Sequence, residues 1–416
     1  MSKLVCKDES FVCGSGCTAC GSCIQICPKS CIEYKLDSMK VKKAVINSEK
    51  CIGCNLCKKS CPECNEIELF SPKKSFAAWS MDELIRRESA SGGIATEMYR
   101  FFAENNGFYA GVLMDEKLHA EYRIFNTVEY YTAFQNSKYV HSNTGNIFIN
   151  IADILNDGDA VLVVGLPCQV SGLIRFLKAK GTGTQKLITV DIVCHGTTPI
   201  EYLEQHIENV ENKKHRKATE VYFRDPKEGT HTFTFSLKDT KGTFYKKKVH
   251  RTDSYQLGYH LGISYRDNCY QCHYACRNRC ADLTISDYSG LGKAKPCAYS
   301  SRNVSCILVN TDKGEKFVSD LISNNRIYAE ERPLCEELEN EKQLNHPTRI
   351  TKMRKDFIDY YVASDDFDIA IKKATKKIMI KNEIRYHLHV QEVRYYLSKV
   401  IPKGIKEILK YITRRR

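Results

Sequence analysis

Between residues 75 and 330, segments with the apolar spacing of a helix alternate with short apolar runs typical of strands. Helical spacing recurs in four segments, and short apolar runs bounded by polar residues or glycine recur in three. We expect helices over residues 81–87, 94–105, 147–155 and 172–178, and strands over 108–114, 160–165 and 187–193. This succession of strands and helices predicts an α/β body.

Two further segments depart from that pattern. Residues 233–237 and 243–249 alternate apolar with polar or basic side chains, which predicts a β-hairpin inserted into the body. Residues 366–416 are predicted to form a basic helical tail, interrupted at Pro402 and Gly404. Apolar residues recur along this tail at near-helical spacing: Ile384, Leu388, Leu397, Ile401, Ile405, Leu409 and Ile412. No apolar run approaches the roughly 20 residues of a membrane span.

Cysteine is the unusual component of the composition. The chain of 416 residues has 21 cysteines, and 12 of them fall within residues 1–70. The first residues contain no apolar targeting segment, so we expect a reducing cytoplasmic location in which the thiols are free to bind metal. We therefore predict four regions: an N-terminal module over 1–70, a body in two parts over 75–155 and 156–330, and a helical basic tail over 331–416. Residues 71–74 are the predicted linker after the module.

Charge is concentrated at one end of the chain. The net charge is +13, of which residues 369–416 carry +11. The remaining chain is nearly neutral, which argues against a uniformly basic nucleic-acid-binding surface. The tail is expected either to pack on the body with a solvated basic face, or to contact an anionic membrane surface or an acidic partner such as ferredoxin.

The N-terminal cysteines form one motif that occurs twice. Its spacing, with a final Cys-Pro, is that of bacterial two-cluster ferredoxins, where three thiolates hold one [4Fe–4S] cube and the fourth reaches the other cube. This predicts one cluster on Cys17, Cys20, Cys23 and Cys61, and a second on Cys51, Cys54, Cys57 and Cys27. Gly21 and Gly53 leave room for N–H groups to approach sulfur. Zinc is the alternative, although it needs two CxxC pairs rather than two sets of four. Four cysteines fall outside both sets and are expected to be spare thiols: Cys6, Cys13, Cys31 and Cys64.

The body contains a second group of cysteines. Cys168 and Cys194 each follow an apolar strand, where open α/β sheets place their sites, and they could combine with Cys269 and Cys272. A rival set is local: Cys269, Cys272, Cys276 and Cys280. A third reading makes Cys168 and Cys194 buried core thiols. Spacing alone leaves these alternatives open.

Several segments resemble the coenzyme F420 hydrogenase/dehydrogenase beta-subunit family over roughly residues 75–320. They are Leu166-Pro-Cys-Gln-Val-Ser-Gly-Leu173, Val193-Cys-His-Gly196, Cys269-Tyr-Gln-Cys272 and Arg279-Cys-Ala-Asp-Leu-Thr-Ile-Ser-Asp-Tyr288. The resemblance implies an α/β flavin and iron–sulfur body fused to an α+β ferredoxin-like module. It also implies bound FAD and favours Cys168, Cys194, Cys269 and Cys272 as ligands of a third cluster. Two departures raise a question about deazaflavin as substrate: Asp287-Tyr-Ser-Gly290 replaces Asp-Phe-Trp-Gly, and His141 stands where glutamine is common.

The resemblance also directs the search for a flavin site. Gly92 and Gly93 open a predicted helix whose N–H groups an anion could approach, so we assign the FAD pyrophosphate to Ser89, Ser91, Gly92 and Gly93. A second flavin segment is Ser137, Lys138, Tyr139 and Ser142. Lys138 is expected to stabilise the anionic reduced ring. His195 joins Lys138 in the catalytic set, as a hydrogen-bond donor beside Cys194 rather than a general base.

These expectations define an oxidoreductase that relays electrons between a two-electron carrier, deazaflavin or similar, and ferredoxin-like partners through FAD and [4Fe–4S] clusters. Relatives of this ferredoxin-fused, tail-bearing kind also occur beside bacterial polysaccharide genes, so a reductive step there is a further possible use. The alternatives are a non-enzymatic electron-carrier module that docks a partner enzyme, and a cluster-dependent structural or regulatory binder.

Overall fold

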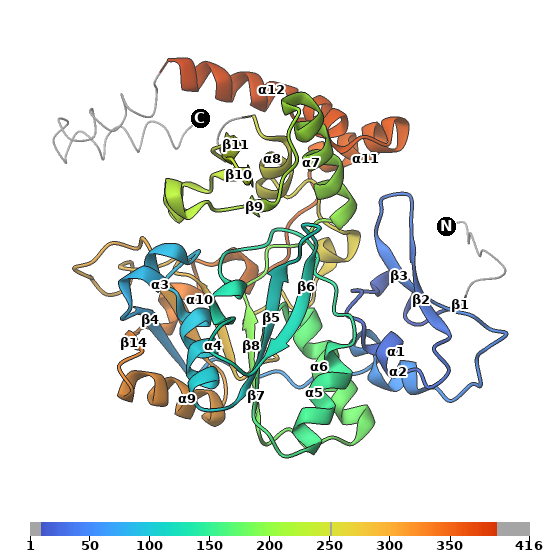
Figure 1. The fold of residues 1–416 in the computed structure, drawn as a ribbon, viewed down its shortest axis with the longest axis vertical. Helices are drawn as coiled ribbons and strands as arrows, with labels where there is room; N and C mark the ends of the chain where they lie inside the picture. Colours follow the sequence, from blue (N-terminus) through green and yellow to red (C-terminus); the bar gives the residue numbers. More distant parts are fainter. Residues whose placement is uncertain (1–9, 250–251, 389–416) are drawn as a thin grey trace.

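An eight-stranded mixed sheet is the centre of the computed structural model, which describes residues 10–249 and 252–388 (Figure 1). The strands lie in the order β14–β4–β13–β12–β8–β7–β5–β6. Their bounds are β4 (Lys74–Ser80), β5 (Phe108–Met114), β6 (Ala120–Phe125), β7 (Val161–Gly165), β8 (Leu187–Ile192), β12 (Leu283–Asp287), β13 (Ser305–Val309) and β14 (Ile327–Arg332). Both predicted parts of the body contribute to this sheet, and their boundary near residue 155 stays a prediction.

The four middle strands determine where chemistry can gather. β5, β7, β8 and β12 are parallel, whereas β6, β13, β4 and β14 pair antiparallel with their neighbours. Parallel strands end at the same edge of a sheet, so the segments after β7, β8 and β12 meet there. Cys168 and Cys194 follow β7 and β8, and Asp287 ends β12.

Helices cover both faces of the sheet. On one face α4 (Ile94–Glu104) and α9 (Asp312–Ser323) pack over Leu162 and Val164. On the other, α5 (Ile147–Asn156) and α6 (Pro167–Lys180) pack over Val161 and Val163. The continuous apolar run of β7 follows from this, because successive side chains point to opposite faces and both are covered. The short helices α3 (Glu83–Glu88) and α10 (Leu334–Leu338) contact β4.

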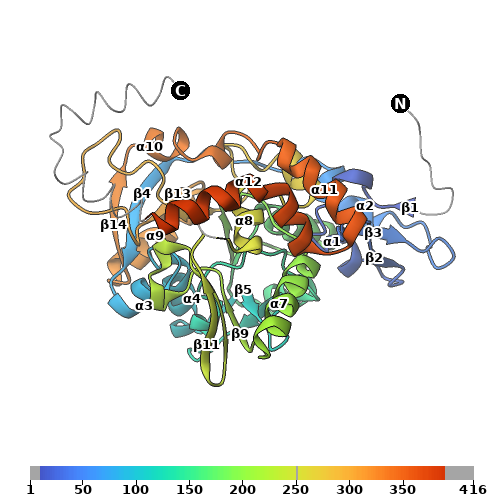
Figure 2. The ribbon, with the colours of Figure 1, turned by 90° about the horizontal axis from the view of Figure 1, so that it is seen from above.

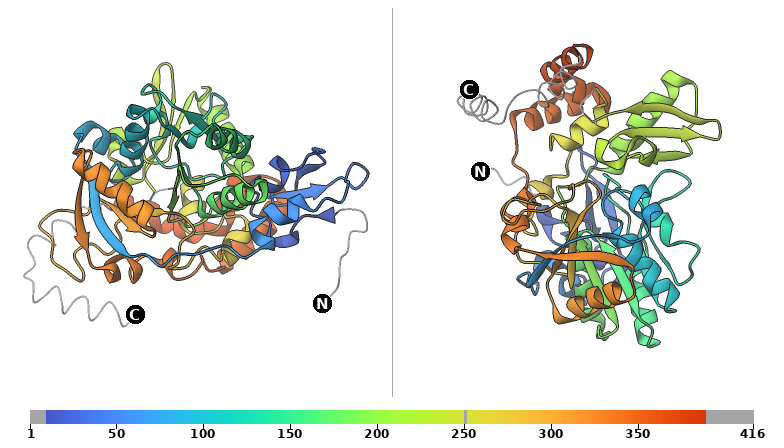
Figure 3. Two further views of the ribbon diagram at one scale, coloured as in Figure 1. Left: turned by 90° about the horizontal axis from the view of Figure 1, so that it is seen from below. Right: turned by 90° about the vertical axis from the view of Figure 1, so that its left-hand side faces the viewer.

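A second lobe lies beyond the sheet, as the right-hand view of Figure 3 shows. It combines a three-stranded antiparallel sheet with four helices, of which α11 and α12 run across it in Figure 2. Its aromatic core includes Tyr202, Phe235, Phe357 and Phe367. β10 and β11 form the predicted hairpin. The elements are β9 (Glu220–Tyr222), β10 (Phe235–Asp239), β11 (Gly242–Lys247), α7 (Ile200–Lys214), α8 (Ser254–His260), α11 (Lys352–Ser364) and α12 (Phe367–His387).

The N-terminal module packs closely against both parts of the molecule. It comprises β1 (Ser10–Phe11), β2 (Ile32–Leu36), β3 (Lys42–Ile46), α1 (Ser22–Gln25) and α2 (Leu56–Ser60). A Cβ added to Gly172 of α6 would lie 2.8 Å from Cys20 Sγ, so only glycine allows this approach. The β2–β3 turn inserts Met39 and Val41 into the core of the second lobe, where the Tyr202 hydroxyl donates to the Met39 carbonyl at 2.8 Å.

Most predicted elements agree with the structure, with differences at their ends. The helix expected from residue 81 begins at Glu83, because Asp82 Oδ1 accepts hydrogen bonds from the N–H groups of Leu84 and Ile85. The helix expected over 172–178 begins at Pro167, whose fixed φ suits a first helical position. The predicted linker is paired rather than free, since the Lys73 N–H donates to the Val309 carbonyl at 2.7 Å.

The tail is described only in part. α12 ends at His387, and its early residues Ala370, Ile371 and Thr375 are buried. Pro402, Gly404 and the apolar positions from Leu397 onward lie outside the described residues. Within the described chain, no helix is both long and apolar enough to cross a membrane.

Candidate functional site

The structure brings Cys61 to the first three module cysteines. Cys17 and Cys61 both contact the Cys13 thiol, and hydrogen bonding with it lowers the pKa of Cys17 to about 6 and that of Cys61 to about 7. Burial raises the pKa of Cys23, and the charges of Cys20, Cys17 and Cys61 raise it further. The four thiols of the first expected set therefore lie together.

Cys27 lies with the second set. Burial raises the pKa of Cys57, and the charges of Cys54, Cys27 and Cys51 add to this effect. The Gly53 N–H donates to Cys51 Sγ at 3.4 Å, as expected for a glycine beside a cluster. Cys51 and Cys54 are exposed, whereas the first set is buried. The second set is thus the one that faces solvent.

Three spare thiols adjoin these sets. Cys13 contacts Cys17 and Cys61, Cys31 Sγ lies 3.4 Å from Cys27 Sγ, and Cys64 hydrogen-bonds to Cys61. Cys6 lies outside the described residues. In the part of the chain that the structure describes, no three His, Cys, Asp or Glu side chains come close enough to hold a single metal ion. A four-iron cube holds its thiolates farther apart than a single ion does.

A cavity of about 390 Å³ lies between the module and the body. Thr18 and Glu63 of the module line one side of it. Four body cysteines also line it: Cys168 in the first turn of α6, Cys194 after β8, and Cys269 and Cys272 in and after the 3-10 helix Asp267–Gln271. Burial raises the pKa of Cys194 to about 12 and that of Cys272 to about 11, with neighbouring thiols contributing.

The alternative ligand set, Cys269, Cys272, Cys276 and Cys280, does not meet at this cavity. Cys276 donates to the Asn278 carbonyl at 3.1 Å, and Cys280 donates to the Pro167 carbonyl at 3.4 Å. Neither thiol lines the cavity. The tertiary fold therefore groups cysteines from three separate segments in preference to four neighbours in sequence.

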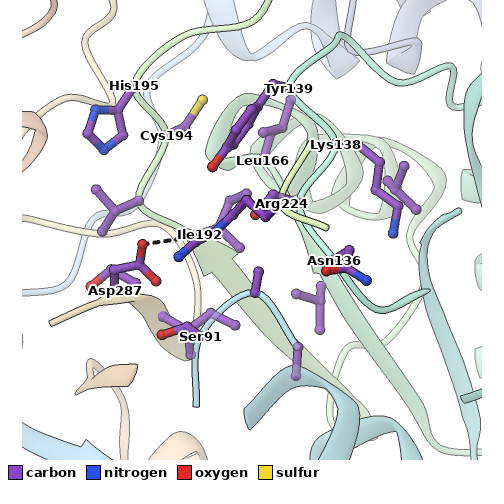
Figure 4. A pocket seen from close by; sticks show the side chains of 18 of the residues that line it. Ser91, Asn136, Lys138, Tyr139, Leu166, Ile192, Cys194, His195, Arg224 and Asp287 are labelled. Carbon is purple, nitrogen blue, oxygen red and sulfur yellow. Dashed lines mark hydrogen bonds and ion pairs between the residues drawn. The ribbon is translucent and has the colours of Figure 1, made fainter. Parts of the chain in front are cut away.

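A larger cavity of about 480 Å³ opens at the carboxyl ends of the parallel strands (Figure 4). It is lined by every residue of the predicted flavin and catalytic sets except Gly92, namely Ser89, Ser91, Gly93, Ser137, Lys138, Tyr139, Ser142 and His195. The side chains are mixed in chemistry, with a wall of stacked aromatics where the Tyr139 and Tyr259 centroids lie 4.3 Å apart. A volume of this size is typical of a small-molecule site.

Gly92 packs tightly against neighbouring strands, and its predicted contact with an anion stays a prediction. Its N–H donates to Ser305 Oγ at 2.9 Å, and its carbonyl accepts from the Ser80 N–H. An added Cβ would lie 2.5 Å from the Ala78 carbonyl oxygen. Gly92 is therefore required for the loop to lie against β4 and β13, while Gly93 lines the cavity at the start of α4.

Lys138 is held at the cavity wall by backbone oxygens. Its amine donates to the carbonyls of Phe134 and Gln135 at 2.9 and 2.7 Å. Burial lowers the pKa of Lys138 to about 7. The amine can therefore gain or lose a proton near neutral pH, which suits it to respond to charge in the cavity.

The structure adds residues that sequence reasoning missed. Arg224 Nη1 donates to Asp287 Oδ2 at 2.8 Å, and both side chains line the larger cavity (Figure 4). Arg224 comes from the lobe, so no local pattern could reveal it. Asp287 begins the Asp-Tyr-Ser-Gly segment that differs from the family's Asp-Phe-Trp-Gly, and this difference was the sequence feature that could have pointed to it. His141, the other departure, is buried but lines neither cavity.

The two cavities share one wall. It consists of Leu166 and the segment from Cys194 to Thr197. His195 belongs to this wall, and its Nε2 lies 3.9 Å from Glu341 Oε1. Cys194 thus borders both the cysteine-lined cavity and the larger one.

Two family models match parts of the chain. Residues 158–334 match the family model for the C-terminal region of the beta subunit of coenzyme F420 hydrogenase/dehydrogenase. This segment is the C-terminal domain of that family. Residues 44–63 match the 4Fe-4S binding domain. No curated protein matches the chain.

One similar solved structure is a chain of the F420-reducing [NiFe] hydrogenase complex from Methanosarcina barkeri. It has 17% identity and a TM-score of 0.44, and the alignment covers 73% of this chain and 92% of that one. The segment 158–334 that matches the beta-subunit family contains all four cysteines of the smaller cavity as well as Arg224 and Asp287. The family and the 4Fe-4S domain together establish an iron–sulfur, oxidoreductase-like role in electron transfer.

Proposed function

We propose that the larger cavity holds FAD and the smaller cavity holds a third [4Fe–4S] cluster, so that the protein is an iron–sulfur flavoprotein oxidoreductase. The observation that carries this proposal is the shared wall. Cys194 borders both cavities, so that groups bound in the two cavities would be neighbours.

The residues of the larger cavity fit a flavin. Asn136 Oδ1 is buried and has no hydrogen-bond partner among the described residues, so it offers an acceptor to a bound ring N–H. Lys138 and Arg224 supply positive charge at the same wall, and the aromatic pair Tyr139 and Tyr259 supplies an apolar surface. The predicted pyrophosphate contacts at Ser89, Ser91 and Gly93 remain part of this proposal.

The residues of the smaller cavity fit a cube. Four thiols crowded together resist ionisation, because burial and mutual charge raise the pKa of Cys168 and Cys194. Iron compensates such charge, and thiolate is the ligand that these clusters use. The rival set lacks this convergence, since Cys276 and Cys280 lie outside the cavity.

In this proposal different residues of the chain have separate roles in electron transfer. A bound flavin supplies the conversion between two-electron and one-electron transfer, which iron–sulfur clusters alone cannot make. Lys138 holds charge at the flavin wall, the aromatic pair orients the ring, and the exposed Cys51 set faces the redox partner protein. The two-electron carrier, deazaflavin or similar, would enter beside Arg224 and Asp287.

The decisive test is the content of iron, acid-labile sulfide and flavin per chain after anaerobic purification. We expect about twelve irons and one FAD, since each cube contributes about four irons. About eight irons without flavin would contradict the proposal for both cavities. It would leave the electron-carrier module that docks a partner enzyme.

A further inference from the structure

A buried arginine joins the module to the wall between the cavities. Arg266 is 2% exposed. Its Nη1 donates to the Thr18 carbonyl at 2.8 Å, and its Nε donates to Thr197 Oγ1 at 3.0 Å. Thr18 lies between Cys17 and Cys20, while Thr197 belongs to the shared wall. One side chain therefore touches the loop of the first module set and the cavity of the body set.

The charge of this arginine has no counter-ion among the described residues. Two acidic residues line the same cavity, and neither forms an ion pair with Arg266. Asp267 pairs with Arg354 at 2.7 Å, and Glu63, whose pKa burial raises to about 7, lies 3.5 Å from His273. No ion pair joins Arg266 to a carboxylate anywhere in the part of the chain that the structure describes. A guanidinium buried without an anion is costly, so a negative group is expected beside it.

Cysteines of the module and of the body lie near this arginine. Arg266 lines the same cavity as Cys168, Cys194, Cys269 and Cys272. Its bond to the Thr18 carbonyl places the guanidinium against the loop that carries Cys17 and Cys20. Its position favours negative charge in the first module set and in the body set alike.

Building on the proposed function, we propose that Arg266 is the shared counter-charge of two iron–sulfur clusters, one on the Cys17 set and one on the Cys168 set. A cluster gains one negative charge when it takes up one electron. A fixed positive charge beside it stabilises that reduced state and raises its reduction potential. Arg266 thus raises the reduction potentials of both clusters, and its two hydrogen bonds hold the module against the cavity wall.

The test is a redox titration, followed by electron paramagnetic resonance, of full-length protein purified anaerobically. The variants are R266Q, which removes the charge, and R266K, which retains it. R86Q is the control, because the half-buried Arg86 also donates to a backbone carbonyl, that of Asn303, but lines neither cavity. The C168S variant identifies the signal of the body cluster.

We expect R266Q to move the potentials of the body cluster and of the first module cluster to more negative values, while R266K and R86Q stay near wild type. Unchanged potentials in R266Q, or equal shifts in R266Q and R266K, would overturn the proposal. If R266Q loses iron, R266K decides: retained iron near the wild-type potential supports a charge requirement, and lost iron contradicts it. Absence of a body cluster from the wild type would instead refute the proposed function, and is seen before any variant is made.

Discussion

The two cysteine-rich regions assemble their thiols in different ways. In the module, each group of three cysteines lies within one short loop and its following helix, and a single crossing residue completes the set. In the body, the four cysteines come from three segments between residues 168 and 272, at the ends of β7 and β8 and in the 3-10 helix Asp267–Gln271. The first region depends on local backbone geometry, and the second depends on the whole sheet.

This difference bears on how the two sites respond to change. A local loop keeps its ligands together as long as the loop exists, whereas a site spread over strand ends requires the sheet and the lobe to be in place. The regions are nevertheless joined, because Gly172 packs on Cys20 and Arg266 bridges Thr18 and Thr197. The following experiments test how separate they are.

The largest expected effect comes from removing a thiol of the shared wall. We expect C194S to lose about four irons of about twelve per chain and to lose flavin as well, since Cys194 borders both cavities. The module's iron should remain. Iron and flavin analysis measures this, with C335S as the control because Cys335 is exposed. Loss of all iron would show that the regions are not separable.

A bulkier residue at the joint should disturb both regions. In G172V the side chain would overlap Cys20, so we expect a loss of stability of about 1–3 kcal/mol and less iron in the first module cluster. Denaturant unfolding and iron content report the two effects. K178A, on the exposed part of the same helix, is the control. Wild-type iron in G172V would mean that the module tolerates displacement from the body.

Lys138 should make the affinity of the larger cavity for reduced flavin depend on pH. Its pKa near 7 means that the amine is protonated below that pH and neutral above it. We expect affinity for the anionic reduced flavin to fall as pH rises through 7, and K138M to bind roughly tenfold more weakly at pH 6. Titration with reduced FAD at pH 6 and pH 9 measures this. The same pH dependence in K138M would exclude Lys138 as its source.

The smallest effect on these sites is expected from the tail. A chain that ends at residue 388 keeps the buried Ala370, Ile371 and Thr375 of α12, whereas ending it at 368 would remove them. We therefore expect wild-type iron and flavin in the longer truncation. Its binding to anionic vesicles should weaken, because residues 389–416 carry a net charge of +6. Unchanged binding to both vesicles and an acidic ferredoxin would contradict a docking role for these residues.

Much of the architecture could be predicted from patterns in the chain. The apolar runs located β5, β7 and β8 to within a residue or so, because strands covered on both faces require continuous apolar sequence. Helix ends were less accurate, since they depend on caps such as Asp82 and on Pro167. The packing role of Gly92 could not be predicted, because its close approach to Ala78 is a tertiary contact.

The sequence by itself determined the cysteine grouping of the module and the α/β order of the body, because both depend on spacing along a short stretch of chain. Only the tertiary structure decided that Cys168 and Cys194 line one cavity with Cys269 and Cys272, whereas Cys276 and Cys280 lie outside it. The same holds for Arg224 and Arg266. Their partners lie tens to hundreds of residues away, and distances of that kind are fixed by the packing of strands and lobes, which no local pattern encodes.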